Sequence, residues 1–237
     1  MMSDVFKFKN FEVSQRQSAM KVGTDGVLLG AWCDVAGVGR ALDVGCGTGL
    51  ISLMLAQKSS TAVVDAIDLD AISIDEASAN FVGSPWSERL SASCVDYADY
   101  SSDMPYDLIV SNPPFFVEKV LSPERRRSCA RQCDSLPFDV LFRKSYALLS
   151  DAGRVAIITP YSIEQEILFA AGEANFWVKK RTYVKTKTVK PAKRILWEFV
   201  KNEVVPEMSE LVLLDADGSR SAAYSALTDD FYVKKPL

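Results

Sequence analysis

The sequence predicts an α/β fold: a doubly wound, mostly parallel seven-stranded sheet with helices on both faces and an antiparallel last strand. Short apolar runs alternate with helix-length amphipathic segments from residue 40 to residue 174, which is typical of βαβ units. A glycine-rich turn, GCGTG, follows the first of these runs. The 237 residues can bury a core of their own, and no repeat or long linker divides them, so we expect one domain over residues 1–237.

The first elements are expected to form a flap over about residues 1–38. Residues 6–13 (FKFKNFEV) alternate between apolar and polar side chains and turn in the middle, which predicts a short hairpin. Thr24 or Asp25 is expected to cap a short helix that ends near Trp32.

The remaining strands and helices are predicted from the alternation of short apolar segments with longer amphipathic ones. Short apolar segments predict strands at 40–44, 62–68, 89–96, 106–112 and 153–159. Longer segments with helical periodicity predict helices at 50–57, 71–82, 138–150 and 163–174. Residues 177–186 and 193–201 alternate in character and are expected to close the sheet as an antiparallel pair.

Composition excludes several classes of function. No apolar run approaches the roughly 18 residues of a membrane span, and the N-terminus lacks the pattern of a secretory signal, so we expect a cytoplasmic protein without a membrane partner. The chain has no histidine, which excludes His-based triads, His general bases and His metal sites. Five cysteines without framework spacing add no metal-binding pattern, so no metal is expected.

The turn after the first strand, LDVGCGTGLIS, is the strongest signal for a ligand. Gly45 and Gly47 let the backbone pass close to a bound molecule. A dinucleotide fingerprint requires a further glycine where the chain has Leu50, which disfavours a nicotinamide oxidoreductase. Asp43, two residues before the first glycine, suits a ligand with a positively charged amine. The alternative is a turn that only packs a helix against a strand.

Acidic residues follow the next two strands. Asp68 ends the second strand, where a carboxylate can accept hydrogen bonds from both hydroxyls of a ribose. Asp96 ends the third strand, beside the expected place of an adenine. The alternative for both is a plain helix cap, the role that we expect for Asp70.

The motif SNPPFF stands at the end of the fourth strand, where ligands bind in doubly wound folds. Pro113 and Pro114 fix the chain and leave the Asn112 side chain and the Pro113 carbonyl as acceptors for an amine. Phe115 or Phe116 offers a face on which a planar target can stack. An amine held in this way can attack a sulfonium methyl in line without a strong base. The alternative is a rigid turn with phenylalanines in the core.

These motifs resemble a known group of enzymes. LDVGCGTG, Asp68, Asp96 and SNPPFF together are similar to class I S-adenosylmethionine (SAM)-dependent methyltransferases of the Asn-Pro-Pro-aromatic group, which methylate adenine N6, guanine N2 or a glutamine amide. Residues 6–32, 122–141 and 226–232 further resemble the bacterial tRNA(Val) adenine-N6 methyltransferase family. That family modifies the adenine 3′ of the anticodon, and the resemblance runs over nearly the whole chain.

The resemblance implies a Rossmann-like fold, SAM as cofactor, tRNA as substrate and a site assembled from several motifs. The residues implied to bind the cofactor are Lys21, Gly23, Thr24, Asp43, Gly45, Gly47, Asp68, Asp96 and Asn112. The residues implied to form the target pocket, and therefore the catalytic candidates, are Asn112, Pro113, Pro114 and Phe115.

Basic residues gather in two segments, although the net charge is −4. Residues 179–194 hold 8 of the 27 basic residues and no acid, and a second cluster follows SNPPFF. The candidates for phosphate contacts around an extruded nucleotide are Arg125, Arg126, Arg127, Arg131, Lys185, Lys187, Lys190, Lys193 and Arg194. The alternative is a solvated face or the protection of an edge strand by lysines.

Other functions stay open at this point. The same chemistry on a glutamine side chain of a translation factor, or on an rRNA guanine, is the first alternative. The glutamine enzymes usually carry an extra N-terminal helical domain, for which residues 1–39 are too few. An RNA-binding protein that holds the cofactor without catalysis is the second. We expect a monomer.

Overall fold

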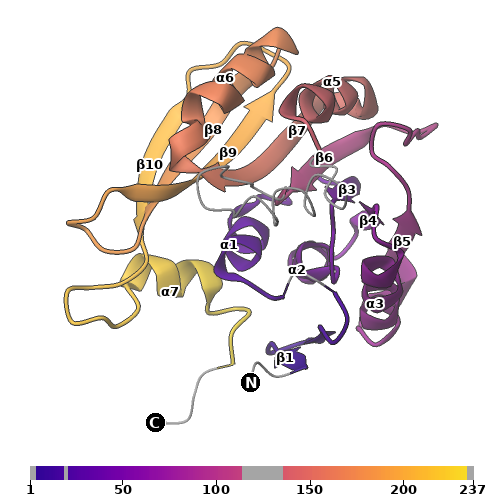
Figure 1. Cartoon of the computed structure of the whole chain (residues 1–237), viewed down its shortest axis with the longest axis horizontal. Helices are drawn as coiled ribbons and strands as arrows, with labels where there is room; N and C mark the ends of the chain where they lie inside the picture. Colours follow the sequence, from indigo (N-terminus) through magenta and orange to yellow (C-terminus); the bar gives the residue numbers. More distant parts are fainter. Residues whose placement is uncertain (1–3, 19–20, 114–135, 234–237) are drawn as a thin grey trace, which may run out of the picture.

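The computed structural model describes residues 4–18, 21–113 and 136–233. A large sheet forms its centre, and a separate hairpin lies to one side (Figure 1). The strands of the sheet are β3 (Arg40–Val44), β4 (Val63–Asp68), β5 (Leu90–Cys94), β6 (Tyr106–Ser111), β7 (Leu149–Pro160), β8 (Trp177–Lys185), β9 (Ala192–Val200) and β10 (Glu207–Val212).

One strand of the sheet runs against the others. Backbone pairing gives the order β10-β8-β9-β7-β6-β3-β4-β5. β9 is antiparallel to both of its neighbours, β7 and β8, whereas β10 pairs parallel with β8. The predicted fold class is confirmed, but the sheet has eight strands and not seven. The reversed strand is β9, inside the sheet, and not the last strand of the chain.

The sequence does not predict β10 because its side chains are mostly exposed. In the segment EMSELV only Leu211 is buried. A strand at the edge of a sheet pairs on one side only and does not need an apolar run. Alternation of apolar and polar residues therefore gives no signal at this position.

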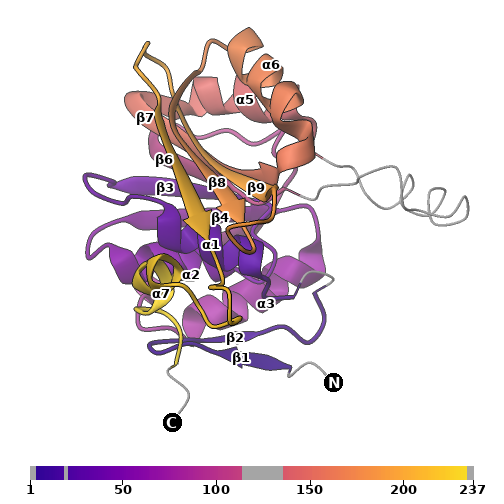
Figure 2. The ribbon, with the colours of Figure 1, turned by 90° about the vertical axis from the view of Figure 1, so that its left-hand side faces the viewer.

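Helices cover both faces of the sheet. They are α1 (Thr24–Trp32), α2 (Leu50–Lys58), α3 (Ala71–Val82), α5 (Phe138–Leu148), α6 (Glu164–Glu173) and α7 (Ala222–Thr228), with short 3-10 turns η1 (Ser87–Arg89) and η2 (Tyr161–Ile163). Figure 2 shows α5 and α6 on one side of the sheet and α1, α2, α3 and α7 on the other. Along β7, Val155 and Ile157 pack in the core cluster that holds residues of α5 and α6. Ala156 and Ile158 pack in the cluster that holds residues of α1 and α2.

The hairpin forms as predicted and precedes α1. β1 (Val5–Lys7) pairs antiparallel with β2 (Glu12–Ser14). The cap of α1 differs from the prediction, because the N-cap residue is Gly23 and no side chain caps the helix. The carboxylate of Asp25 instead accepts a hydrogen bond from Arg194 of β9.

The carboxyl ends of β3, β4 and β6 lie side by side. In the register of the sheet, Val44 lies opposite both Ile67 and Ser111. The hydroxyl of Ser111 also donates to the carbonyl oxygen of Val44 at 2.8 Å. The segments that begin with Gly45 and Asn112 therefore leave the sheet at the same edge, where parallel sheets bind ligands.

None of the helices in the described ranges combines the length and the apolar character of a membrane span.

Candidate active site

The turn between β3 and α2 is built by glycines in left-handed backbone conformations. Gly45, Gly47 and Gly49 have φ angles of 71°, 54° and 79°, which residues with a Cβ rarely adopt. A Cβ on Gly45 or Gly47 would meet no atom within 4 Å. A Cβ on Gly49 would lie 2.4 Å from the ring of Phe81. The first two glycines therefore border open space, and the third allows α3 to pack closely against the start of α2.

A cleft of about 510 Å³ lies against this turn, within the range of small-molecule sites. Its walls are the glycine turn with the start of α2, the segment that leads into α1, and the end of β6. Residues predicted to bind the cofactor line it, namely Lys21, Gly23, Thr24, Gly45, Gly47 and Asn112. Pro113, predicted for the target pocket, lines it as well. The fold thus brings three distant sequence segments to one cleft.

Asp43 lies beneath the turn and not on the wall of the cleft. It is completely buried, and its Oδ2 accepts hydrogen bonds from the backbone N–H (3.0 Å) and the hydroxyl (2.7 Å) of Ser52 in α2. Its Oδ1 is buried without a hydrogen-bond partner among the described residues. Burial raises the pKa of Asp43 to about 7, against the lowering effect of the Ser52 hydrogen bonds. Burial also raises the pKa of the Cys46 thiol, so this thiol stays protonated at neutral pH. Cys46 itself lines the cleft.

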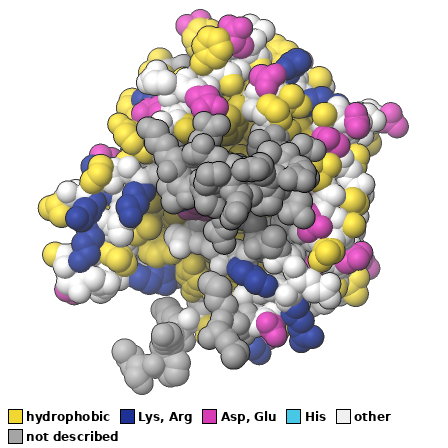
Figure 3. Space-filling view, viewed as in Figure 1, with side chains coloured by type: hydrophobic (Ala, Val, Ile, Leu, Met, Phe, Trp, Pro, Cys, Tyr) yellow, Lys and Arg dark blue, Asp and Glu magenta, His cyan; other side chains and the backbone are white. Residues whose placement is uncertain are grey.

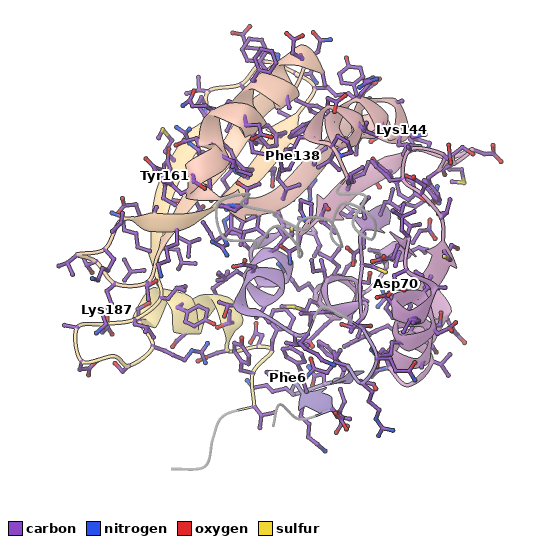
Figure 4. All side chains as sticks on the ribbon, viewed as in Figure 1. Phe6, Asp70, Phe138, Lys144, Tyr161 and Lys187 are labelled. Carbon is purple, nitrogen blue, oxygen red and sulfur yellow. The ribbon has the colours of Figure 1, made fainter. Side chains whose placement is uncertain are left out.

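The two other acids are placed differently from each other. The carboxylate of Asp68 accepts hydrogen bonds from the N–H groups of Gly47 and Asp70, both at 2.9 Å. Its oxygens keep lone pairs for further donors. Asp68 contacts Gly47 of the turn but does not itself line the cleft. Asp96 accepts a hydrogen bond from the N–H of Ala98 at 2.7 Å within its own turn, and neither caps a helix nor lines the cleft. Asp70 caps α3 as predicted, at the position labelled in Figure 4.

The target motif is described only in its first half. Asn112 is partly buried and Pro113 is buried at the end of β6. The other candidates of this region lie outside the described residues, namely Pro114, Phe115, Arg125, Arg126, Arg127 and Arg131.

Three of the candidate RNA-binding cations make contacts within the protein. Nε of Arg194 donates to Oδ2 of Asp25 at 2.7 Å, and Asp25 lines the cleft. Nζ of Lys185 lies 2.6 Å from Oε1 of Glu210. Lys187 donates to a backbone oxygen in the loop that precedes α7. Arg194 therefore links β9 to the cleft wall, a role that the charge run alone does not predict.

Lys190 and Lys193 differ from these three because they are exposed. The connection between β8 and β9 holds Lys190 and lies on the side of the molecule where Figure 4 labels Lys187, and Lys193 is the second residue of β9. Figure 3 shows Lys and Arg side chains gathered on that side. Both lysine side chains are therefore open to solvent.

Comparison with known proteins assigns the family. The sequence profile described as "Methyltransferase small domain" matches residues 19–133. The tRNA1(Val) (adenine(37)-N6)-methyltransferase of Parabacteroides distasonis is 39% identical over 99% of this chain and 100% of its own length. The protein of the same name from Aliivibrio fischeri is 40% identical over 98% of this chain and 99% of its own. The chain belongs to the tRNA1(Val) (adenine(37)-N6)-methyltransferase family.

Solved structures show the fold of this methyltransferase. A predicted O-methyltransferase from Agrobacterium tumefaciens has a TM-score of 0.69 at 16% identity, covering 87% of this chain and 96% of its own. A glycopeptide N-methyltransferase in complex with SAM has a TM-score of 0.57 at 11% identity, and the match covers 77% of this chain and 100% of that protein. At these identities the likeness is one of fold alone. Family and fold together make the chain a SAM-dependent methyltransferase.

The cleft of this methyltransferase fits SAM in two respects. The backbone at Gly45 and Gly47 leaves room for close approach of a ligand. The unpartnered Oδ1 of Asp43 is an acceptor beneath that turn, and buried acceptors normally have a donor or an ordered water.

Sequence motifs miss two polar residues of α3 that bind the chain segment leading to the cleft wall. Glu76 and Asn80 of α3 are 9% and 6% exposed and bind the segment before Lys21. A signal exists in retrospect, because they are polar, four residues apart and therefore on one helix face. Asp25, which pairs with Arg194, gives no such signal.

Proposed function

We propose that this chain transfers the methyl group of SAM to N6 of adenine 37 in tRNA1(Val). The observation that carries the proposal is the position of Asn112 and Pro113 on the same cleft as Gly45 and Gly47. Relatives that match nearly the whole chain are named for this activity.

The residues of the chain act by orientation. When bound, SAM supplies a methyl group on a positively charged sulfonium. The side-chain oxygen of Asn112 and the carbonyl of Pro113 accept hydrogen bonds from the exocyclic amine and direct its lone pair towards the methyl carbon. The amine nitrogen forms its bond to carbon as the carbon–sulfur bond breaks, and the nitrogen then loses a proton to water. From the sequence motif, the proposal assigns stacking on the adenine ring to Phe115 or Phe116, and such stacking is worth roughly 1–3 kcal/mol.

The basic segments meet the RNA backbone. An enzyme that acts on a base must extrude it from its stack, and phosphate contacts hold the flanking nucleotides during that step. In this proposal the contacts come from the exposed Lys190 and Lys193 and from the arginines that follow SNPPFF. The proposal includes a monomeric enzyme that acts on tRNA in the cytoplasm; light scattering in solution should give the chain mass of 26.1 kDa.

The test is transfer of labelled methyl from SAM to unmodified tRNA1(Val), followed by mass spectrometry of the nucleosides. We expect N6-methyladenosine at position 37 and no product from a transcript with guanosine there. Label in a protein or on guanine would favour the alternative amine targets. Binding of tRNA without transfer at saturating SAM would refute catalysis and leave an RNA-binding protein.

A further inference from the structure

Residues 14–18, here termed the strap, are bound by two side chains of α3, and the carboxylate of Glu76 binds residues 16–18. Oε1 of Glu76 accepts hydrogen bonds from the backbone N–H groups of Arg16 and Gln17, the latter at 3.0 Å. Oε2 accepts from the N–H (2.9 Å) and the hydroxyl (2.5 Å) of Ser18. Figure 2 shows the hairpin that precedes the strap beside α3, on the face of the sheet opposite α5 and α6. One side chain thus satisfies three backbone donors of an irregular segment.

Asn80, one turn further along α3, joins the strap to the glycine turn. Its Oδ1 accepts from the N–H of Ser14 at 2.8 Å, and its Nδ2 donates to the carbonyl of Ser14 at 3.0 Å. The same Nδ2 donates to the carbonyl of Thr48 at 2.9 Å. Thr48 lies in the glycine turn and lines the cleft. The strap and the floor of the cleft are therefore held by the same side chain.

The strap in turn contacts the opposite wall of the cleft through Gln15. Oε1 of Gln15 accepts a hydrogen bond from the N–H of Val22 at 2.7 Å. The backbone oxygen of Gln15 accepts a hydrogen bond from Nζ of Lys21. Lys21 and Val22 both line the cleft. A continuous series of hydrogen bonds leads from α3 through the strap to the cleft wall.

The charge of Glu76 is maintained at neutral pH. Burial tends to raise the pKa of Glu76, but the hydrogen bonds from Ser18, Gln17 and Arg16 outweigh burial and lower it below its usual value. Removal of this carboxylate would leave three backbone N–H groups without their acceptor, which favours detachment of the strap from the helix.

We propose that Glu76 and Asn80 are positioning residues for cofactor binding: they hold the strap against α3 so that Lys21 and Val22 form the wall of the cleft. Neither residue lines the cleft itself. When the strap is released, only the fraction of molecules with a formed wall binds ligand, and the apparent affinity falls in proportion. The inference rests on the proposed function only in taking SAM as the ligand.

Two near-isosteric variants and a matched control test the inference. Glu76→Gln replaces one acceptor oxygen by a donor that faces backbone N–H groups. Asn80→Asp keeps the acceptor for Ser14 and places an oxygen against two carbonyls. Asp75→Asn removes the same charge as Glu76→Gln from an exposed position on the same helix. Calorimetric titration with S-adenosylhomocysteine should show a Kd raised at least about tenfold for the first two variants and unchanged for Asp75→Asn.

Steady-state kinetics separates positioning from general damage. We expect KM for SAM to rise in Glu76→Gln and Asn80→Asp, with kcat at saturating SAM and KM for tRNA within about twofold of wild type. Normal affinity for S-adenosylhomocysteine in both variants, or an equal loss in kcat and in tRNA binding, would overturn the inference.

Amide hydrogen exchange on the wild-type protein covers the case in which a variant does not fold. S-adenosylhomocysteine should slow exchange at the amides of Arg16, Gln17 and Ser18, which do not line the cleft. Unchanged exchange there at saturating ligand would refute the inference. Failure of the proposed function is distinguishable, because binding of S-adenosylhomocysteine and exchange are measured without RNA.

Discussion

The substitution Asp43→Asn should remove a pH dependence of stability that the wild-type protein carries. The folded state raises the pKa of this carboxyl from 3.8 to about 7, chiefly through burial. The folded protein therefore binds a proton at Asp43 more tightly than the unfolded chain does. Its free energy of unfolding must fall as the pH rises from about 4 to about 7. The chain has no histidine, so the side chain that ordinarily titrates in this window is missing.

The size of the effect follows from the shift. One unit of pKa corresponds to about 1.4 kcal/mol, and the titration between pH 5 and pH 8 covers most of a shift from 3.8 to about 7. The wild-type protein should lose roughly 2–3 kcal/mol of unfolding free energy between these pH values. The amide side chain introduced by Asp43→Asn keeps an acceptor for Ser52 and does not titrate, so the variant should be nearly flat over this range.

Urea unfolding of the ligand-free proteins at pH 5, 6, 7 and 8 measures both profiles. Glu76→Gln serves as a control, because the pKa of Glu76 is lowered in the folded state. The stability that Glu76 contributes is present above its unfolded pKa and is lost only in acid, so this variant should keep the wild-type slope. Parallel profiles for the wild-type protein and Asp43→Asn would refute the assignment of the slope to Asp43.

Three further outcomes are expected. Gly49→Ala should cost about 2 kcal/mol or more in urea unfolding, because a Cβ there meets Phe81 at 2.4 Å and the φ angle is positive; stability within 0.5 kcal/mol of wild type, roughly the surface-substitution range, would contradict this. Asn112→Ala should lower kcat about a hundredfold while the Kd for S-adenosylhomocysteine changes less than about threefold; unchanged turnover would remove Asn112 from the reaction. The double substitution of Lys190 and Lys193 by Ala should weaken tRNA binding and reduce the slope of log K against log salt by about 1.5; an unchanged slope would mean that these lysines do not meet phosphate.

The sequence predicts those parts of the site that consist of residues next to one another in the chain. The turn at Gly45 and Gly47 and the motif at Asn112 are local, and the parallel sheet carries them to one edge. The strap contacts of Glu76 and Asn80 join residues 58 to 66 positions apart, and the Arg194–Asp25 pair spans 169. A pattern along the chain contains no information on such pairs until the fold is known.

Asp43 and β10 (Glu207–Val212) show a different limit of sequence reasoning. The sequence singles out Asp43 as a residue for a ligand amine, and it gives no sign that Ser52 of α2, nine residues away, occupies Oδ2. Oδ1 has no partner among the described residues, so the contact with a ligand amine stays a prediction. For β10 the exposed edge of the sheet removes the apolar pattern on which strand prediction depends.

The position of β9 between β7 and β8 has a consequence for synthesis on the ribosome. Both strands that pair with β8, namely β9 and β10, follow it in the chain. A nascent chain that stops at residue 190 contains every strand around the glycine turn, but β8 has no neighbour and exposes its backbone donors and acceptors. Early termination should therefore yield fragments that associate through this unpaired strand, although they already contain the residues that line the cleft.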